Sequence, residues 1–170
     1  RLDAGGWHSA KYAGEPLPTF ASIARWARAH GVACNVEIKP TPGRERETGA
    51  AVAFDAATLW REAEVPPLLS SFSEIALDAA RSAVPELPRA LLVERPLPAD
   101  WMDRLARLEC VALDADHHAL DAETVRRAHA GGYSVLCWTA NESDRIATLA
   151  AWGVDGIITD SVDHVPADSL

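Results

Sequence analysis

Residues 35–40 read NVEIKP, the end of an apolar strand that carries a carboxylate and an ammonium group two positions apart. Side chains alternate along a strand, so Glu37 and Lys39 share one face while Val36 and Ile38 share the other. The fold must therefore explain why two opposite charges and a proline stand at the end of this strand.

Apolar strand-like runs and helix-like stretches alternate on both sides of this segment. The predicted strands are 32–39, 66–72, 89–94, 110–115, 134–140 and 155–160. The predicted helices are 19–30, 49–63, 73–84, 99–108, 121–131 and 142–153. Continuous apolar strands between helices are typical of parallel sheets covered by helices, so the chain is predicted to be α/β, with six β/α units.

A doubly wound sheet and a (β/α)₈ barrel both give this alternation, and the polar residues favour the barrel. Glu37, Ser71, Trp138 and one of Asp114 or Asp116 fall at carboxyl ends of strands, where barrel active sites are built. No glycine-rich phosphate loop follows any strand. A barrel has eight units in about 250 residues, so the chain is predicted to supply the last six units and to lack the first two.

The composition is that of a folded acidic domain. Hydrophobic residues make up 48% of the 170 residues, and the net charge of −9 argues against a nucleic-acid partner, which requires a basic face. No apolar run has the length of a membrane span, and the first residues lack the layout of a secretory signal. Cys34, Cys110 and Cys137 fit buried free thiols better than a disulfide framework. These features predict a cytoplasmic protein.

On the residues alone, two interpretations of Glu37 and Lys39 stay open. A carboxylate at the mouth of a barrel is a good ligand for a hard cation, and a neighbouring lysine neutralises a phosphate oxygen. An ion pair that only closes the strand end explains the same two residues.

Four motifs, taken in order, resemble those of the glycerophosphodiester phosphodiesterase family. They are NVEIKP (35–40), PPLLSSF (66–72), CWTAN (137–141) and WGVDGIITD (152–160). The opening DAGGWHSAKYAGEPLPTF (3–20) resembles the small insertion and following helix start of the cytosolic bacterial enzyme. Each motif is weak alone, but the ordered set covers the chain, 1–170, with an insertion loop at 1–18 and β/α units at 19–170.

The resemblance implies a TIM barrel of the phospholipase C-like phosphodiesterase type. It also implies hydrolysis of glycerophosphodiesters, such as glycerophosphocholine or glycerophosphoethanolamine, to sn-glycerol 3-phosphate and an alcohol, with a divalent cation, Ca²⁺ or Mg²⁺. Glu37 matches the family's metal-binding glutamate, and Lys39 matches the lysine near the substrate phosphate. Trp138 matches an aromatic position that lines the substrate pocket, and Ser71 and Phe72 match a serine–phenylalanine pair at a strand end.

Other motifs of the family are absent from this chain. Its H-R-G and E-N-T motifs, its E-x-D pair and its second catalytic histidine carry the catalytic histidines, a catalytic arginine and the other metal ligands. No catalytic residue is therefore assigned here. We expect the 170 residues alone to be inactive, with a vacancy beside Glu37 between the strands 32–39 and 155–160, and a homo-oligomer stays open.

Three further segments hold weaker candidates. His117 is predicted at a pocket edge and His118 in solvent, because neighbours on an extended segment point in opposite directions. Trp7, in the insertion, is predicted to cover the pocket. The run TPGRERETG (41–49) predicts a solvated loop at the active-site face.

Two other functions stay open. One is a phospholipase D-like or phosphoinositide-cleaving relative on the same barrel, which a basic or apolar lipid-facing loop would favour; the sequence shows no such loop. The other is a non-catalytic barrel fragment that binds partners.

Overall fold

The computed structural model describes residues 2–163 and 165, and within them the chain forms one six-stranded sheet. The strands are β1 (Asn35–Glu37), β2 (Leu68–Ser71), β3 (Arg89–Val93), β4 (Ala112–Asp116), β5 (Ser134–Trp138) and β6 (Gly156–Ile157). Neighbouring strands are parallel throughout, and their order in the sheet is their order in the chain. A doubly wound sheet reverses its order at a switch point, so this sheet is the wall of a barrel, as predicted.

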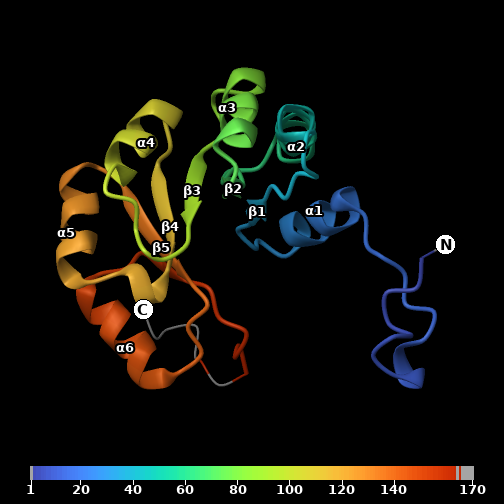
Figure 1. Ribbon diagram of the computed structural model, residues 1–170. Coiled ribbons are helices and arrows are strands. Elements are labelled where there is room, and N and C mark those ends of the chain that lie inside the picture. The colour runs from blue at the N-terminus through green and yellow to red at the C-terminus, as the bar shows by residue number, and fades with distance from the viewer. Residues whose placement is uncertain (1, 164, 166–170) are drawn as a thin grey trace.

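Helices connect the strands on the outer side of the curved sheet (Figure 1). They are α1 (Phe20–Ala29), α2 (Glu45–Leu59), α3 (Glu74–Ala83), α4 (Trp101–Leu108), α5 (Ala122–Ala130) and α6 (Ser143–Trp152), with short 3₁₀ helices η1 (Ala10–Tyr12) and η2 (His117–Ala119). Each predicted helix and strand is present in the structure, with shifted boundaries. The prediction of six β/α units is confirmed.

The apolar core lies between the sheet and its helices. Leu91, Leu113 and Val135 are aligned across β3, β4 and β5, and each is at most 2% exposed. They belong to a cluster with the buried faces of α4, α5 and α6, and a second cluster joins β1 and β2 to α2 and α3. The outward strand residues therefore hold the fold together, and the inner face is free for other chemistry.

The sheet is open between β1 and β6. These strands stand at the two ends of the strand order, and they do not pair with each other in the part of the chain that the structure describes. The vacancy predicted between them is therefore confirmed. Ile23 and Trp26 on α1, next to the open side, are 48% and 56% exposed.

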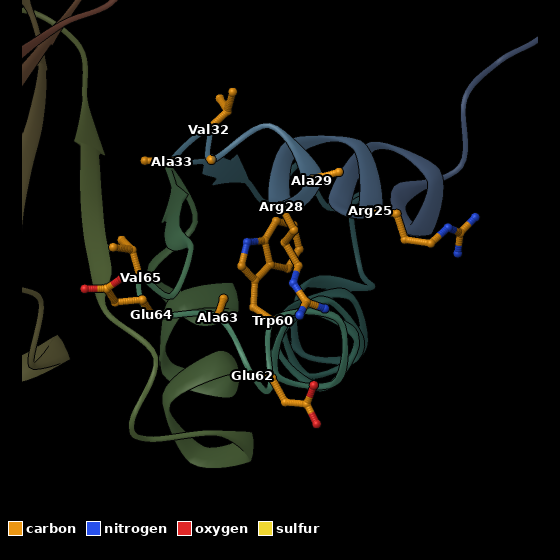
Figure 2. A pocket seen from close by; sticks show the side chains of 11 residues that line it. Arg25, Arg28, Ala29, Val32, Ala33, Trp60, Glu62, Ala63, Glu64 and Val65 are labelled. Atoms are coloured by element: carbon orange, nitrogen blue, oxygen red, sulfur yellow. The ribbon is translucent and has the colours of Figure 1, made fainter.

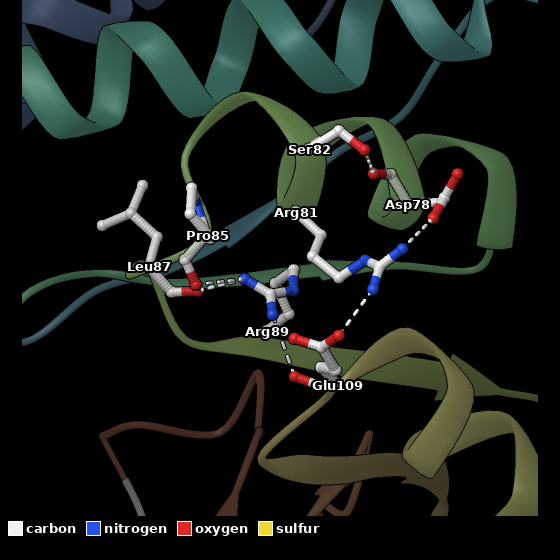
Figure 3. A network of polar contacts seen from close by, with 7 residues as sticks. All are labelled: Asp78, Arg81, Ser82, Pro85, Leu87, Arg89 and Glu109. Carbon is white, nitrogen blue, oxygen red and sulfur yellow. Dashed lines mark hydrogen bonds and ion pairs between the residues drawn. The ribbon is translucent and has the colours of Figure 1, made fainter.

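A buried arginine ties the loops at the amino ends of the strands (Figure 3). Arg89, the first residue of β3, is 3% exposed, and its guanidinium donates to the carbonyl oxygens of Pro85, Leu87 and Glu109 at 3.1, 2.6 and 3.0 Å. Burial lowers the pKa of Arg89 from its ordinary value. Because a buried carbonyl without a partner costs about 1–3 kcal/mol, this one side chain stabilises two turns, the one before β3 and the one before β4.

The segment 41–49 is a loop only in its first part, so that prediction was partly wrong. Helix α2 begins at Glu45, where acidic residues in the first turn favour the positive end of the helix dipole. Arg44 pairs with Glu47 of the same segment, and Arg46 lies 3.6 Å from Asp78 on α3. Both arginines are thus engaged away from Glu37.

The three cysteines are free thiols, as predicted, and the predicted burial is confirmed for two of them. Cys110 and Cys137 are buried free thiols, and burial raises the pKa of each to about 12. Cys34 is also free but only half-buried, because it lies before the short first strand at the open side of the sheet.

Candidate functional site

Glu37 and Lys39 lie together at the carboxyl end of β1. The Nζ atom of Lys39 is 3.2 Å from a carboxylate oxygen of Glu37, and the two side chains are 77% and 33% exposed, in that order. Val36 and Ile38 pack in the core instead, as the alternation predicted. An ion pair this exposed adds only about 0–1 kcal/mol to stability, so a structural role alone explains little of its presence.

The inner face of the sheet holds a second carboxyl group below this pair. Asp114 on β4 is fully buried, and one of its oxygens accepts a hydrogen bond from the Asn35 side chain on β1 at 3.2 Å. Its other oxygen has no partner among the described residues. Burial, opposed by the Asn35 hydrogen bond and reinforced by the charge of Glu37, raises the pKa of Asp114 to about 6.

Sequence reasoning noted Asp114 but left the choice between Asp114 and Asp116 open, and it missed Asn35. The signal for Asn35 was its place two residues before Glu37, which puts it on the same face of β1. Asn35 and Asp114 join β1 to β4 across the interior, so they fix the strand that carries Glu37.

The aromatic residues of the predicted pocket do come together. Trp138 at the end of β5 and Phe72 just after β2 meet edge to face, with ring centroids 5.5 Å apart and an interplanar angle of 80°. The indole nitrogen of Trp138 also lies 3.4 Å from the backbone oxygen of Asp114. These two strands are not neighbours, so the ring pair spans the mouth of the half-barrel.

Ser71 lies on the opposite face of its strand from Ser70, which is aligned with Glu37. Its buried hydroxyl donates to the Ile38 carbonyl at 2.7 Å and accepts from the Ser73 backbone at 3.0 Å. The structure therefore gives Ser71 a role in the turn that ends β2, and does not place it with the pocket residues.

The side chains of His117 and His118 were predicted to point in opposite directions, and in the structure they do not. Residues 117–119 form the 3₁₀ helix η2 rather than an extended segment, so the rings of His117 and His118 lie against each other with centroids 3.8 Å apart. His118 is exposed as predicted, whereas His117 is buried, and both line one hollow. The prediction that adjacent side chains cannot share a site was wrong here. Together with Asp116, they form a group close enough to hold a metal ion, with candidate ligand atoms within 4.8 Å.

The insertion stands apart from the sheet (Figure 1). Its turns are held by Asp3, whose carboxylate accepts from the backbone of Gly5, Gly6 and Gly14 at 2.9, 2.8 and 3.0 Å. Trp7 is 84% exposed, and its indole donates to the Ala4 carbonyl within the same insertion. The covering role of Trp7 stays a prediction.

A hollow of about 600 Å³ lies at the other end of the half-barrel (Figure 2). It is bounded by the end of α1, by residues 31–33 before β1 and by the segment between α2 and β2. Trp60 forms its floor, and Arg28, on its wall, donates to the Leu59 carbonyl at 2.7 Å. The hollow lies at the amino ends of the strands, so it is separate from Glu37.

The donor set at Glu37 fits a hard divalent cation in part. A carboxylate oxygen is the ligand that Ca²⁺ and Mg²⁺ prefer, and Glu37 presents one at the mouth of the sheet. Among the described residues, Lys39 is the only positively charged side chain that forms an ion pair with this carboxylate. Such ions take at least six oxygen ligands or waters, so Glu37 would be one ligand of a larger set.

A family model supplies the remaining evidence. Residues 1–164 match the model described as the Glycerophosphoryl diester phosphodiesterase family. The chain belongs to this family. The predicted family is confirmed, and so is the fold, as the later units of its TIM barrel.

Three relatives from the glycerophosphodiester phosphodiesterase family are 26 to 32% identical to this chain. A glycerophosphodiester phosphodiesterase of Caldanaerobacter subterraneus is 28% identical over 94% of this chain and 65% of its own length. One from Bacillus subtilis is 26% identical over 96% of this chain and 60% of its own. A phosphodiesterase of Oleispira antarctica, solved with the product sn-glycerol 3-phosphate, is 32% identical with a TM-score of 0.84 over 95% of this chain and 64% of its own.

The chain thus spans less than two thirds of these relatives. No helix of the described residues combines the length and apolar character needed to cross a membrane.

Proposed function

We propose that the protein containing this chain hydrolyses glycerophosphodiesters to sn-glycerol 3-phosphate and an alcohol. The observation that carries the proposal is the exposed Glu37–Lys39 pair, 3.2 Å apart at the carboxyl end of a barrel strand in a member of the glycerophosphodiester phosphodiesterase family. The complex of the Oleispira relative with sn-glycerol 3-phosphate supports this choice of product.

The chain's own residues would position the phosphodiester. Glu37 would hold a divalent cation, Ca²⁺ or Mg²⁺, as one of several ligands, and the bound cation would supply Lewis-acid polarisation of the phosphate. Lys39 would offset charge that builds on the phosphate oxygens. Trp138 and Phe72 would form the wall against which the glycerol part packs, and Asn35 with Asp114 would keep the strand of Glu37 in place.

A direct assay tests the function. We expect the complete eight-unit protein to release sn-glycerol 3-phosphate from a glycerophosphodiester. We also expect a chelator to abolish this release and added Mg²⁺ or Ca²⁺ to restore it, because the carboxylate of Glu37 is proposed as a ligand of a hard cation. An enzyme-coupled assay for sn-glycerol 3-phosphate measures both steps. Full activity in excess chelator would contradict the proposed requirement for a divalent cation. Activity on intact phospholipids or phosphoinositides alone would favour the alternative substrates.

Cytoplasmic location and assembly as a homo-oligomer stay predictions. Fractionation of cells that make the protein and light scattering of the purified eight-unit protein measure the two properties.

A Trp138 series separates a pocket role from a packing role. Truncating a large aromatic side chain costs about 3–5 kcal/mol of stability, so Trp138→Ala is expected to lower the melting temperature in either case. If Trp138 lines the pocket, its kcat/KM at 20 °C also falls, and Trp138→Phe recovers most of it because the contact with Phe72 needs only a ring. Trp101→Phe, in the outer core at 3% exposure, is the control for stability loss alone. Unchanged kinetics in Trp138→Ala would show that Trp138 contributes only packing and does not contact the substrate.

A further inference from the structure

The inner face of the sheet contains buried polar atoms that have no partner. Among the described residues, four buried side-chain nitrogen and oxygen atoms lack a hydrogen bond. Two of them are oxygens on this face, Oγ of Ser70 on β2 and Oδ1 of Asp114 on β4, and both residues are fully buried. Ser70 is aligned with Glu37 on the neighbouring strand, so the two side chains point to the same face. The proposed cation ligand therefore stands beside an interior that is polar and only partly satisfied.

Asp114 differs from Ser70 because it carries a charge when it is ionised. The amide group of Asn35 donates to Oδ2 of Asp114 at 3.2 Å. No cationic side chain forms an ion pair with Asp114 in the part of the chain that the structure describes. A buried charge is normally paired, because burial removes its hydration and only a partner of opposite charge makes up for the loss. Asp114 therefore holds a negative charge that the described residues leave without a counter-charge.

The charges of Asp114 and Glu37 act on each other. Burial is the main cause of the raised pKa of Asp114, the hydrogen bond from Asn35 opposes it, and the charge of Glu37 adds to it. With a pKa of about 6, the carboxyl group is still ionised at pH 8. Two like charges within electrostatic reach of each other destabilise each other, and a cation that binds near both relieves the repulsion.

Asn35 connects the two carboxylates through the backbone of β1. It lies two residues before Glu37, on the same face of a strand of only three residues. Among the described strands, β1 pairs with β2 alone. The bond from Asn35 to Asp114 joins residues that are 79 positions apart in the sequence, and it holds this short edge strand from the inside. Asp114 thus reaches Glu37 both by its charge and by this contact.

We propose that Asp114 strengthens the binding of a divalent cation at Glu37 without contacting the cation. The inference rests on the proposed function and adds a residue to its site. The buried charge of Asp114 attracts the cation, and its contact with Asn35 holds the strand that carries Glu37. Asp114 is therefore a positioning residue. In the protein without a cation, the same buried charge lowers stability.

Two other roles would also explain a buried carboxylate at this place. Asp114 would serve stability alone if its contact with Asn35 were its whole function. It would also serve stability if the first two β/α units brought in a cationic side chain that pairs with it. In both cases, removal of the charge destabilises the protein, because a favourable contact is weakened or a buried cation is left unpaired. The proposed role predicts the opposite sign.

The Asp114→Asn variant of the complete protein separates these roles. Asn keeps the size of the side chain and still accepts from Asn35, but it has no charge. At pH 8, calorimetric titration with Ca²⁺ or Mg²⁺ is expected to show an affinity about 10- to 100-fold lower than that of the unmodified protein. The melting temperature of the cation-free variant is expected to rise by about 2–4 °C, because a buried charge without a counter-charge is removed. A purely structural role cannot lower the affinity and raise the stability together.

Two further variants are controls for Asp114→Asn. Ser70→Ala removes the other unpartnered oxygen of the inner face without a change in charge, and it is expected to change the cation affinity less than about twofold, since that oxygen makes no hydrogen bond. Asp55→Asn removes one negative charge from an exposed position of α2. Because solvent and salt screen exposed charges, we expect it to leave the affinity and the melting temperature unchanged.

The two measurements together decide the proposal. A lower melting temperature of Asp114→Asn with unchanged cation affinity would overturn it in favour of a structural role. Equal losses of affinity in Asp114→Asn and Asp55→Asn would also overturn it, because they would reflect net charge alone. If the complete protein hydrolyses no diester, the proposed function fails, while calorimetry and melting temperatures still test Asp114. A complete protein that binds neither Ca²⁺ nor Mg²⁺ would rule out the inference directly.

Discussion

The Glu37→Gln variant of the complete protein is expected to lose more than about 100-fold in kcat/KM toward glycerophosphodiesters. Residues that only support a metal ligand already cost 10- to 100-fold when they are replaced, and Glu37 is proposed as a ligand itself. Gln keeps the size of the side chain but removes the negative charge that attracts a hard cation. It also leaves Lys39 without the carboxylate that lies 3.2 Å from its Nζ atom.

Calorimetric titration with Ca²⁺ and Mg²⁺, alongside the kinetics, shows whether affinity falls with turnover. The matched control is Glu62→Gln, because Glu62 lines the hollow at the amino ends of the strands, on the far side from the proposed site. Since an exposed ion pair contributes little stability, the melting temperature of Glu37→Gln is expected to stay within a few degrees of the parent. Near-normal hydrolysis by this variant at low metal concentration would remove Glu37 from the ligand set.

The second large effect concerns the 170 residues by themselves. We expect this chain to show no diesterase activity and to associate. Within the part of the chain that the structure describes, β1 and β6 each present an unpaired edge, and free sheet edges promote pairing with other chains. Ile23 and Trp26 add exposed apolar surface on α1 beside the open side.

Light scattering over a range of protein concentrations measures the association, and the complete eight-unit protein is the comparison. We expect the mass of the short chain to rise with concentration and that of the comparison protein to stay fixed. Supplying the first two β/α units of a family member as a separate chain is expected to reduce the association. A concentration-independent monomer with metal-dependent activity would show that six units suffice.

The sequence predicted the architecture because the strongest signals in it are periodic. Continuous apolar strands such as 89–93 can only be covered on both sides in a parallel α/β fold, and the alternation within 35–40 set the faces of Glu37 and Ile38 correctly. The aromatic meeting of Phe72 and Trp138 also follows from register, since both lie at carboxyl ends of strands around one mouth.

The predictions that were wrong share a physical cause. The local direction of the backbone depends on contacts with residues that are far away in the sequence. The turn at 117–119 was expected to be extended, but Arg145 on α6 holds both the ring and the carbonyl of His117 in a 3₁₀ turn. The start of α2 at Glu45 was hidden because a helix first turn rich in charge has the same composition as a loop. Neither feature has a periodic signature.

Because of the contacts that Arg89 makes, the two ends of the half-barrel are expected to differ in how well they tolerate changes in loop length. Its three carbonyl partners come from the turns that lead into β3 and β4, at the end of the half-barrel away from Glu37. A change in the length of these turns would leave the buried guanidinium of Arg89 without its carbonyl partners, so we expect such changes to be destabilising. The loops at the opposite end contain no buried arginine among the described residues, so a change in their length leaves no buried charge without partners, although Arg145 holds the turn after β4 through His117. The loops at the end that carries Glu37 are therefore expected to tolerate changes in length better than the two turns that Arg89 holds.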